Sequence, residues 1–315
     1  MASENREKPA WLVTGAQGFL GANAGLYLRG KARTIGLTRT GVTPNLFDEG
    51  ITGDLTNPGE IAKAIIERRP TVVLHAAALA SHEACEADPA LAERINVDAT
   101  RVLAQAAQEA GAQFIYISTD AVFDGSRGDY TETDEPSPFS VYGETKLGGE
   151  QQALNETAAL IVRTNFFGWS PSGHRSILEF FVNELSAGHK VQGYTDFVVT
   201  STYVQYLLDS IWRLPLHEVT GIVNVVSSDR LSKNDFGRET ARVFALRRGL
   251  IEPVEATLSQ RHKSRSRDLS LDTAKLAQLL RSDIPSQARG IQAASKDSSA
   301  RLLLLRANSQ ESSAS

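Results

Sequence analysis

The 315-residue sequence is poor in several residue types, and each shortage excludes a class of structure. Cys85 is the only cysteine, so the chain cannot form an intrachain disulfide. Its six histidines are scattered, without the close pairing that is typical of metal sites. No run of about 20 apolar residues is present to cross a membrane. We therefore expect no disulfide scaffold, no metal centre and no membrane contact, and we expect Cys85 to be an inert thiol.

An excess of basic charge is also missing. The chain has 33 Lys and Arg against 37 Asp and Glu, which gives a net charge of −4 at pH 7. Nucleic-acid-binding domains usually cluster Lys and Arg on one face, so no nucleic-acid partner is expected. The first eight residues lack the apolar segment of a secretory signal. We therefore expect a cytoplasmic protein.

Apolar, strand-like runs alternate with helical patterns over the first half of the chain. The runs cover 10–14, 33–38, 71–75, 113–118 and 158–163, and the helical patterns cover 19–30, 58–69, 89–111 and 142–157. Such alternation is typical of a parallel sheet that is covered by helices on both faces. The sequence therefore predicts an α/β fold, a Rossmann-type doubly wound parallel sheet with a smaller C-terminal substrate lobe.

Three glycines follow the first strand-like run, at positions 15, 18 and 21. Gly15 permits a tight turn, Gly18 lets the backbone approach a pyrophosphate, and Gly21 allows a helix to pack closely on the strand. Free N–H groups at the start of that helix can bind the anion. The spacing differs from Gly-x-Gly-x-x-Gly, which leaves a purely structural loop as the alternative. We predict a dinucleotide site that also includes Gln17, Phe19 and Leu20.

The residue that discriminates between NADH and NADPH is expected about 20 positions further on. A carboxylate there would hold the ribose 2′-hydroxyl of NADH, but the segment 34–39, Thr-Ile-Gly-Leu-Thr-Arg, contains none. The guanidinium of Arg39 suits the 2′-phosphate of NADPH. We therefore expect NADPH, with NADH as the alternative cofactor. The alternative for Arg39 is an ordinary exposed arginine in a loop.

Tyr142 and Lys146 are four positions apart, so they share one face of a predicted helix. A nearby ammonium group favours the ionised form of a phenol, and such a phenol can give a proton to a developing alkoxide. Thr119, at the end of the run 114–118, is expected to offer its hydroxyl to the same oxygen. This predicts a carbonyl reductase with Thr119, Tyr142 and Lys146 as catalytic residues. The alternative is a solvated surface pair.

Further segments complete a resemblance to a known family. They are Gly-Asp-Leu-Thr (53–56), His-Ala-Ala-Ala (75–78), Ile-Asn-Val-Asp-Ala-Thr (95–100), Ser-Thr-Asp-Ala-Val-Phe-Asp-Gly (118–125), Tyr-Gly-Glu-Thr-Lys (142–146), Val-Arg-Thr-Asn (162–165) and Arg-Asp-Leu-Ser-Leu-Asp (267–272). With the glycine segment 14–21, they make residues 10 to 280 resemble an extended short-chain dehydrogenase/reductase. Within that group the chain resembles the dTDP-4-dehydrorhamnose reductases, and the segment 118–125 is the most diagnostic.

The resemblance implies further contacts to the adenine, ribose and nicotinamide of the cofactor. They fall on Asp54, Leu55, Ala76, Ala77, Ala78, Tyr142 and Lys146. His75, which ends an apolar strand, is expected to have a structural role.

The aromatic loop 165–169, Asn-Phe-Phe-Gly-Trp, is predicted to contact the substrate, because a flat sugar or base face stacks on aromatic rings. The alternative places its two phenylalanines in the core. The related reductases usually have Arg-Thr-Ser-Trp here, and a Gly-x-Pro-Thr segment where this chain has 194–201. Our substrate candidates are Ser118, Asn165, Phe166 and Trp169.

The alternation loosens after Arg163, and this predicts the domain boundaries. We expect a Rossmann domain at 8–165 that binds NAD(P), with 196–225 returning to it, and a substrate lobe formed by 166–195 and 226–285. Residues 286–315 are rich in Ser, Ala and Gln, which predicts a largely disordered tail.

Three functions compete on this scaffold. The first is an NADPH-dependent reductase of a nucleotide-linked 4-keto-6-deoxy sugar in deoxysugar biosynthesis. The second is an NAD-dependent sugar-nucleotide epimerase, and the third is a catalytically silent, NADP-binding regulatory subunit. A dehydratase is disfavoured because Asp120 is followed by Ala121 instead of a glutamate. The sequence leaves the sugar, its nucleotide and the oligomeric state open, a homodimer included.

Overall fold

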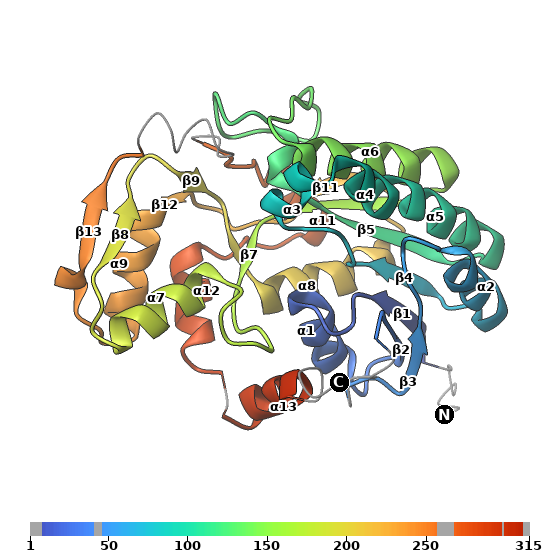
Figure 1. Ribbon diagram of the computed structural model, residues 1–315, viewed down its shortest axis with the longest axis horizontal. Coiled ribbons are helices and arrows are strands. Elements are labelled where there is room, and N and C mark those ends of the chain that lie inside the picture. The colour runs from blue at the N-terminus through green and yellow to red at the C-terminus, as the bar shows by residue number, and fades with distance from the viewer. Residues whose placement is uncertain (1–7, 41–45, 257–267, 298, 311–315) are drawn as a thin grey trace.

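A seven-stranded sheet forms the centre of the computed structural model, which describes residues 8–40, 46–256, 268–297 and 299–310. The strands lie in the order β11-β6-β5-β4-β1-β2-β3, and each neighbouring pair is parallel (Figure 1). This confirms the predicted doubly wound parallel sheet. The strands are β1 (Ala10–Thr14), β2 (Arg33–Thr38), β3 (Glu49–Thr52), β4 (Val72–His75), β5 (Gln113–Thr119), β6 (Leu160–Thr164) and β11 (Gly221–Asn224).

The central strands are apolar on both faces, which explains why they read as continuous apolar runs. In β1, Trp11 and Val13 join the hydrophobic core on one face of the sheet, while Leu12 joins the core on the other. The same alternation separates Ile115 from Phe114 in β5. Because side chains alternate along a strand, each strand contributes to both cores.

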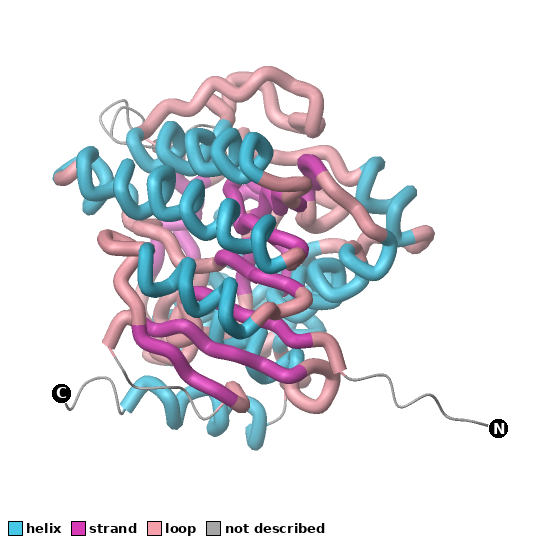
Figure 2. Tube along the Cα trace, turned by 90° about the vertical axis from the view of Figure 1, so that its right-hand side faces the viewer, coloured by secondary structure: helices cyan, strands magenta, loops and turns pink. Residues whose placement is uncertain are grey.

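Helices cover both faces of the sheet. The helices α2 (Gly59–Arg68), α5 (Ala99–Ala110) and α6 (Val141–Glu156) pack side by side on one face, and Figure 2 shows a row of helices across the central strands. On the other face α1 (Phe19–Leu28) packs against α8 (Val204–Arg213). α11 (Ala274–Leu280) contacts the edge strand β11.

The helical pattern predicted at 89–111 contains an irregularity at its centre. It comprises α4 (Pro89–Glu93), a π-helical turn η1 (Arg94–Asp98) and α5. π-turns within helices often occur at functional sites. Here the turn carries the buried side chain of Asn96, whose contacts are described below.

Short strands and helices after β6 form the region beside the sheet, at the left of Figure 1. β8 (Val191–Tyr194) pairs in parallel with β13 (Ile251–Val254), β7 (Phe166–Phe167) in parallel with β10 (Thr202–Tyr203), and β9 (Val198–Val199) antiparallel with β12 (Leu231–Ser232). α7 (Ile177–Ser186) packs against α9 (Lys233–Val243), and α9 packs against β8. The short helices α3 (His82–Ala87), η2 (Asp120–Val122), η3 (Pro215–His217) and η4 (Arg248–Leu250) lie in the connections between these elements.

The prediction that 286–315 is largely disordered is wrong for the residues that the structure describes. α12 (Gln287–Ala294) packs against α9 and β10, and its Ile291 is buried. α13 (Ser299–Gln310) packs against α1 and buries Leu305. The guanidinium of Arg301 also donates to Asn23 Oδ1 at 2.6 Å. A few apolar residues at helical spacing therefore anchor a segment whose composition is mostly small and polar.

None of the helices in the described ranges is long and apolar enough to span a membrane.

Candidate active site

A cavity of about 770 Å³ lies where β1, β4, β5 and β6 end. Strand order reverses between β1 and β4, and ligands of open α/β sheets bind at such a switch point. The cavity is large enough for a cofactor. The predicted cofactor residues that line it are Gly15, Gly18, Phe19, Leu20, Gly21, Arg39, Asp54, Leu55, Ala76, Ala77, Ala78, Tyr142 and Lys146. Gln17 does not line it; its side chain accepts a hydrogen bond from Thr40 at 3.4 Å.

The three glycines form a cradle at the start of α1. Gly15 has a φ of +70°, a region that favours glycine, and a Cβ on Gly21 would overlap the Gly15 carbonyl oxygen. A Cβ on Gly18 would lie 3.0 Å from the same oxygen. No side chain caps the N-terminus of α1, so its N–H groups are left for another acceptor. These features fit the pyrophosphate of a dinucleotide.

A buried histidine holds in place the backbone that lines this cavity after β4. Thr14 Oγ1 accepts from the N–H groups of Ala76 and Ala77 at 3.1 and 3.0 Å, so its own proton goes to His75 Nδ1 at 2.8 Å. Burial lowers the pKa of His75 to about 3, which keeps the ring neutral. The structural role expected for His75 is therefore to hold Thr14, and through it the backbone that follows β4.

Asn96 is a supporting residue that sequence reasoning did not single out. Its Oδ1 accepts from Leu79 N at 2.9 Å, and its Nδ2 donates to Leu79 O and to Thr145 Oγ1, at 3.1 and 3.0 Å. The side chain thus ties the cavity wall after β4 to the helix that carries Lys146. Its position inside a π-turn was not predictable from the helical pattern.

Two cationic side chains approach the cavity far from the Tyr–Lys pair in sequence. Arg39 is exposed and follows β2, and its positive charge contributes to lowering the pKa of Asp54, after the hydrogen bonds from Thr56. Arg175 also lines the cavity and was not predicted. Its backbone N–H donates to the fully buried carboxylate of Glu179 at 2.9 Å, which holds the loop in place.

Thr119 lies at the end of β5 and makes two hydrogen bonds with the residues that follow it. Its hydroxyl donates to Asp120 Oδ1 at 3.0 Å and accepts from the N–H of Ala121 at 3.1 Å. The hydroxyl is thus directed along the chain to the neighbouring carboxylate.

Tyr142 lies in the first turn of α6, which Ser140 caps. Burial raises the pKa of Tyr142 to about 12, and a hydrogen bond with Thr119 opposes this. Lys146 is not among the groups that shift this pKa, so the expectation that Lys146 lowers it is wrong. A phenol with this pKa is protonated at neutral pH and can still serve as a proton donor.

The physical reason lies in the position of the Lys146 amine. It donates to Ile117 O at 2.7 Å and lies 3.9 Å from the centre of the Tyr116 ring. Burial lowers the pKa of Lys146 to about 7, although the nearby carboxylate of Glu150 raises it. Lys146 therefore changes its charge near neutral pH.

A buried ion pair supports the helix behind Lys146. Arg163 donates to Glu150 through Nε at 2.9 Å and through Nη2 at 2.7 Å, and both side chains are almost fully buried. Ser118 Oγ donates to the same carboxylate at 2.5 Å. This pair joins β5 and β6 to α6.

A second cavity of about 340 Å³ shares Ala80, Thr119, Tyr142 and Asn165 with the first. Sequence reasoning missed most of its lining, because the residues come from distant segments. The new ones are His82, Phe139, Ser140, Phe197, Val198, Val199, Lys233 and Leu269, together with Asp120 and Ala121. Thr119 and Tyr142, which both carry hydroxyl groups, thus lie where the two cavities meet.

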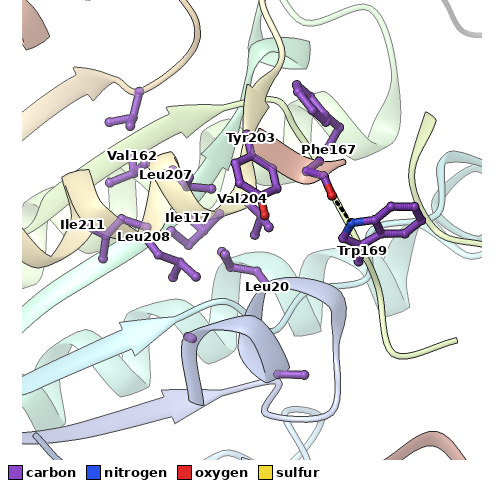
Figure 3. Packing of buried hydrophobic residues seen from close by; sticks show 14 of the residues in the cluster. Leu20, Ile117, Val162, Phe167, Trp169, Tyr203, Val204, Leu207, Leu208 and Ile211 are labelled. Carbon is purple, nitrogen blue, oxygen red and sulfur yellow. Dashed lines mark hydrogen bonds between the residues drawn. The ribbon is translucent and has the colours of Figure 1, made fainter. Parts of the chain in front are cut away.

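The four predicted substrate residues are divided. Ser118, Asn165 and Phe166 line the first cavity, and Asn165 also lines the second. Trp169 lines neither cavity, so the predicted substrate contact of Trp169 is wrong. Its indole is buried and donates to Ala294 O at 2.9 Å, the bond drawn as a dashed line at Trp169 in Figure 3. The indole also packs against Phe244.

Phe166 and Phe167 also take different positions. Phe167 is fully buried, in agreement with the alternative that placed the phenylalanines of this loop in the core (Figure 3). Phe166 is only partly buried, and its ring centre lies 5.1 Å from that of Phe19.

Cys85 is fully buried, and burial raises the pKa of its thiol. In the described part of the chain, no three His, Cys, Asp or Glu side chains gather as they would around a metal ion.

Comparison with known proteins gives relatives over most of the chain. It is 30% identical over 250 residues to a dTDP-4-keto-6-deoxy-D-glucose reductase of Streptomyces niveus, which covers 78% of this chain and 82% of that protein. It is 37% identical over 154 residues to the methionine adenosyltransferase 2 subunit beta of Mus musculus, or 48% of this chain and 45% of that protein.

Among solved structures, a hypothetical dTDP-4-dehydrorhamnose reductase from Sulfolobus tokodaii superimposes with a TM-score of 0.79. It is 28% identical in sequence, and the match covers 89% of this chain and 98% of that one. The family model described as the RmlD substrate binding domain matches residues 10–299. Together with the glycine cradle, the Tyr–Lys helix and the strand order, this match shows that the chain belongs to the RmlD substrate-binding domain family.

Proposed function

We propose that this protein is an NADPH-dependent reductase of a nucleotide-linked 4-keto-6-deoxy sugar. One observation carries the proposal: the hydroxyl groups of Thr119 and Tyr142 lie where a cofactor-sized cavity meets a smaller one. A carbonyl group bound at that junction would lie beside both residues and face the larger cavity. In this proposal 8–165 and 196–225 hold the cofactor, 166–195 and 226–285 hold the substrate, and the enzyme works in the cytoplasm.

The residues of the junction divide the work of the reduction. The hydride that reaches the carbonyl carbon would come from NADPH held in the larger cavity. Tyr142 gives its phenolic proton to the oxygen, and this transfer is favourable because an alkoxide is a stronger base than a phenolate. Thr119 holds the same oxygen through its hydroxyl. Lys146, on the face of α6 that lines the larger cavity, would hydrogen-bond the nicotinamide ribose through its amine.

The smaller cavity supports a nucleotide-linked deoxysugar as substrate. Phe139, Phe197, Val198, Val199 and Leu269 give it apolar walls, which suit the methyl group of a 6-deoxy sugar. Lys233 also lines it, and its ammonium group suits the diphosphate that joins a sugar to its nucleoside. The relative that is 30% identical and named dTDP-4-keto-6-deoxy-D-glucose reductase supports this substrate class.

The choice of cofactor gives a testable prediction. Arg39→Ala is expected to weaken NADPH binding by about 1.5–3 kcal/mol, because a hydrogen bond to a charged group is lost. NADH, which has no 2′-phosphate, should bind almost as before. Isothermal titration of both cofactors to wild type and variant measures the two changes. An equal loss for both would mean that Arg39 acts on the structure and not on the phosphate.

The direct test of the function is turnover of defined substrates. Wild-type protein is incubated with NADPH and a panel of dTDP-, GDP- and UDP-linked 4-keto-6-deoxy sugars, and the loss of NADPH absorbance and the product stereochemistry are followed. The proposal expects reduction of at least one member of the panel.

Two other outcomes would replace the proposal. An interconverted sugar with no net use of NADPH indicates an epimerase. Tight NADPH binding without consumption, together with a changed activity of a co-purifying enzyme, indicates a regulatory subunit. The partial match to a methionine adenosyltransferase subunit is the reason for testing this role.

A further inference from the structure

Asp120 is a buried carboxylate at the junction of the cavities, and the mechanism above gives it no task. Its side chain is 4% exposed and lines the smaller cavity. It lies between the hydroxyl of Thr119, which donates to Oδ1 at 3.0 Å, and the amide of Asn165, which donates to Oδ2 at 2.8 Å. Burying a charged carboxylate costs free energy unless it is paired or hydrogen-bonded, and these two donors hydrogen-bond Asp120.

The direction in which Thr119 donates its proton depends on the protonation state of Asp120. A hydroxyl has one proton, and an ionised carboxylate can only accept. While Asp120 is ionised, the Thr119 proton is therefore directed to Asp120. It is then not available to hydrogen-bond a substrate oxygen. A neutral Asp120 can instead donate to Thr119 Oγ1, which leaves the Thr119 proton free to point into the junction.

Asn165 fixes which oxygen of Asp120 faces Thr119. Its Oδ1 accepts from Ser201 Oγ at 2.6 Å, so its Nδ2 must point to Asp120. Its backbone oxygen accepts from Thr202 N at 2.8 Å, which holds the residue against the segment before β10. With Oδ2 occupied as an acceptor, a proton on Asp120 belongs on Oδ1, next to Thr119.

We infer that Asp120 is a positioning residue whose protonation state sets the direction of the Thr119 hydroxyl. The inference rests on the proposed reductase function. Neutral Asp120 donates to Thr119, and Thr119 then donates to the carbonyl oxygen that is being reduced. Asp120 keeps its proton throughout, so no net proton transfer passes through it.

The surroundings of Asp120 bring its pKa into the pH range in which the enzyme can be assayed. Burial raises the pKa of Asp120 to about 6, although the hydrogen bonds from Asn165 and Thr119 lower it. A substrate that displaces water from the smaller cavity is expected to raise it further. The titratable groups around that cavity and junction are Tyr142 and Lys146 on α6, His82 on α3 and Lys233 on α9.

The test replaces Asp120 by a residue that cannot ionise but keeps the same shape. In Asp120→Asn, the new amide oxygen can accept from Asn165 while its NH₂ group donates permanently to Thr119. Wild-type kcat/KM, which reports the free enzyme, is expected to fall as the pH rises through about 6. Two units above the pKa only about one Asp120 in a hundred is neutral.

We expect the ratio of kcat/KM at pH 5 to kcat/KM at pH 8 to be at least about tenfold smaller in Asp120→Asn than in wild type. The titration of Lys146 near pH 7 remains in both proteins and cancels in this comparison. An Asp120→Asn profile parallel to that of wild type overturns the inference. A uniform loss of about 10²-fold or more at every pH, as expected for Thr119→Val, also overturns it.

A second variant moves the titration instead of removing it. Asn165→Asp keeps the acceptor for Ser201 and places a second carboxyl group against Asp120. Two such groups share a proton, so the fall in kcat/KM should move up by about one pH unit or more. If kcat/KM of Asn165→Asp falls at the same pH as that of wild type, the inference is contradicted, because the titrating group is then not Asp120. If wild-type protein reduces no member of the panel, the proposed function itself fails, and that result is distinct from either profile.

Discussion

Replacing Tyr142 with Phe is expected to lower kcat by about 10²–10⁴-fold, the usual contribution of a positioned general acid. Only the hydroxyl is removed, and the ring keeps its packing against His82, whose ring centre lies 4.7 Å away. NADPH binding should therefore survive. Steady-state kinetics with the best substrate of the panel, and titration of NADPH to the variant, measure the two quantities separately.

A matched control shows that the loss belongs to the position and not to the type of change. Tyr206 lies on α8, lines neither cavity and packs edge-on against Tyr203. Tyr206→Phe should leave kcat within about twofold of wild type, since Tyr206 is partly buried away from both cavities and the ring keeps its packing. A Tyr142→Phe enzyme that retains a tenth of the wild-type kcat would show that another group protonates the oxygen.

The strands of the central sheet were predictable where they are buried on both faces. β1, β2 and β5 are continuous apolar runs, and their predicted positions agree with the structure to within a residue. The edge strands β3 and β11 were missed as strands. β3 is short and has no buried residue, so neither an apolar run nor a clear alternation marks it. Edge pairing depends on the neighbouring strand, which local sequence does not encode.

The cofactor side of the site was predictable because its residues lie close together in the chain. The glycine cradle and the Tyr–Lys pair each occupy one turn or one helix, so spacing alone indicates their geometry. The smaller cavity was not predictable in this way. Phe197, Lys233 and Leu269 reach it from three separate segments, and only tertiary packing brings them together.

The tuning of Tyr142 and Lys146 shows a second limit of sequence reasoning. Spacing at i and i+4 predicts a shared helix face, but it does not predict burial or competing acceptors. In the folded chain the Lys146 amine binds Ile117 O, and burial outweighs any attraction between the pair. The predicted substrate contact of Trp169 failed for a similar reason, because α12 supplies a carbonyl oxygen that buries the indole.

The buried ion pair behind the site carries the largest expected effect on stability. Glu150→Gln keeps the volume of the side chain and an acceptor for Ser118, but it leaves the charge of Arg163 buried without a counter-ion. Arg163 Nη1 already has no hydrogen-bond partner among the described residues. Breaking such a pair from one side costs about 3–5 kcal/mol, so the urea midpoint should fall strongly at an unchanged m-value.

Two comparisons make the Glu150 prediction specific. Glu252→Gln breaks the exposed pair that Lys190 and Glu252 form at 2.8 Å, and it should leave the urea midpoint nearly unchanged. The double variant Glu150→Leu with Arg163→Met removes both buried charges, and it should recover much of the stability that the single variant loses. Glu150 also opposes the burial that lowers the pKa of Lys146, so Glu150→Gln should lower that pKa further. A single variant as stable as wild type would mean that water or local rearrangement already solvates Arg163, and the pair would then contribute nothing to holding α6 against the sheet.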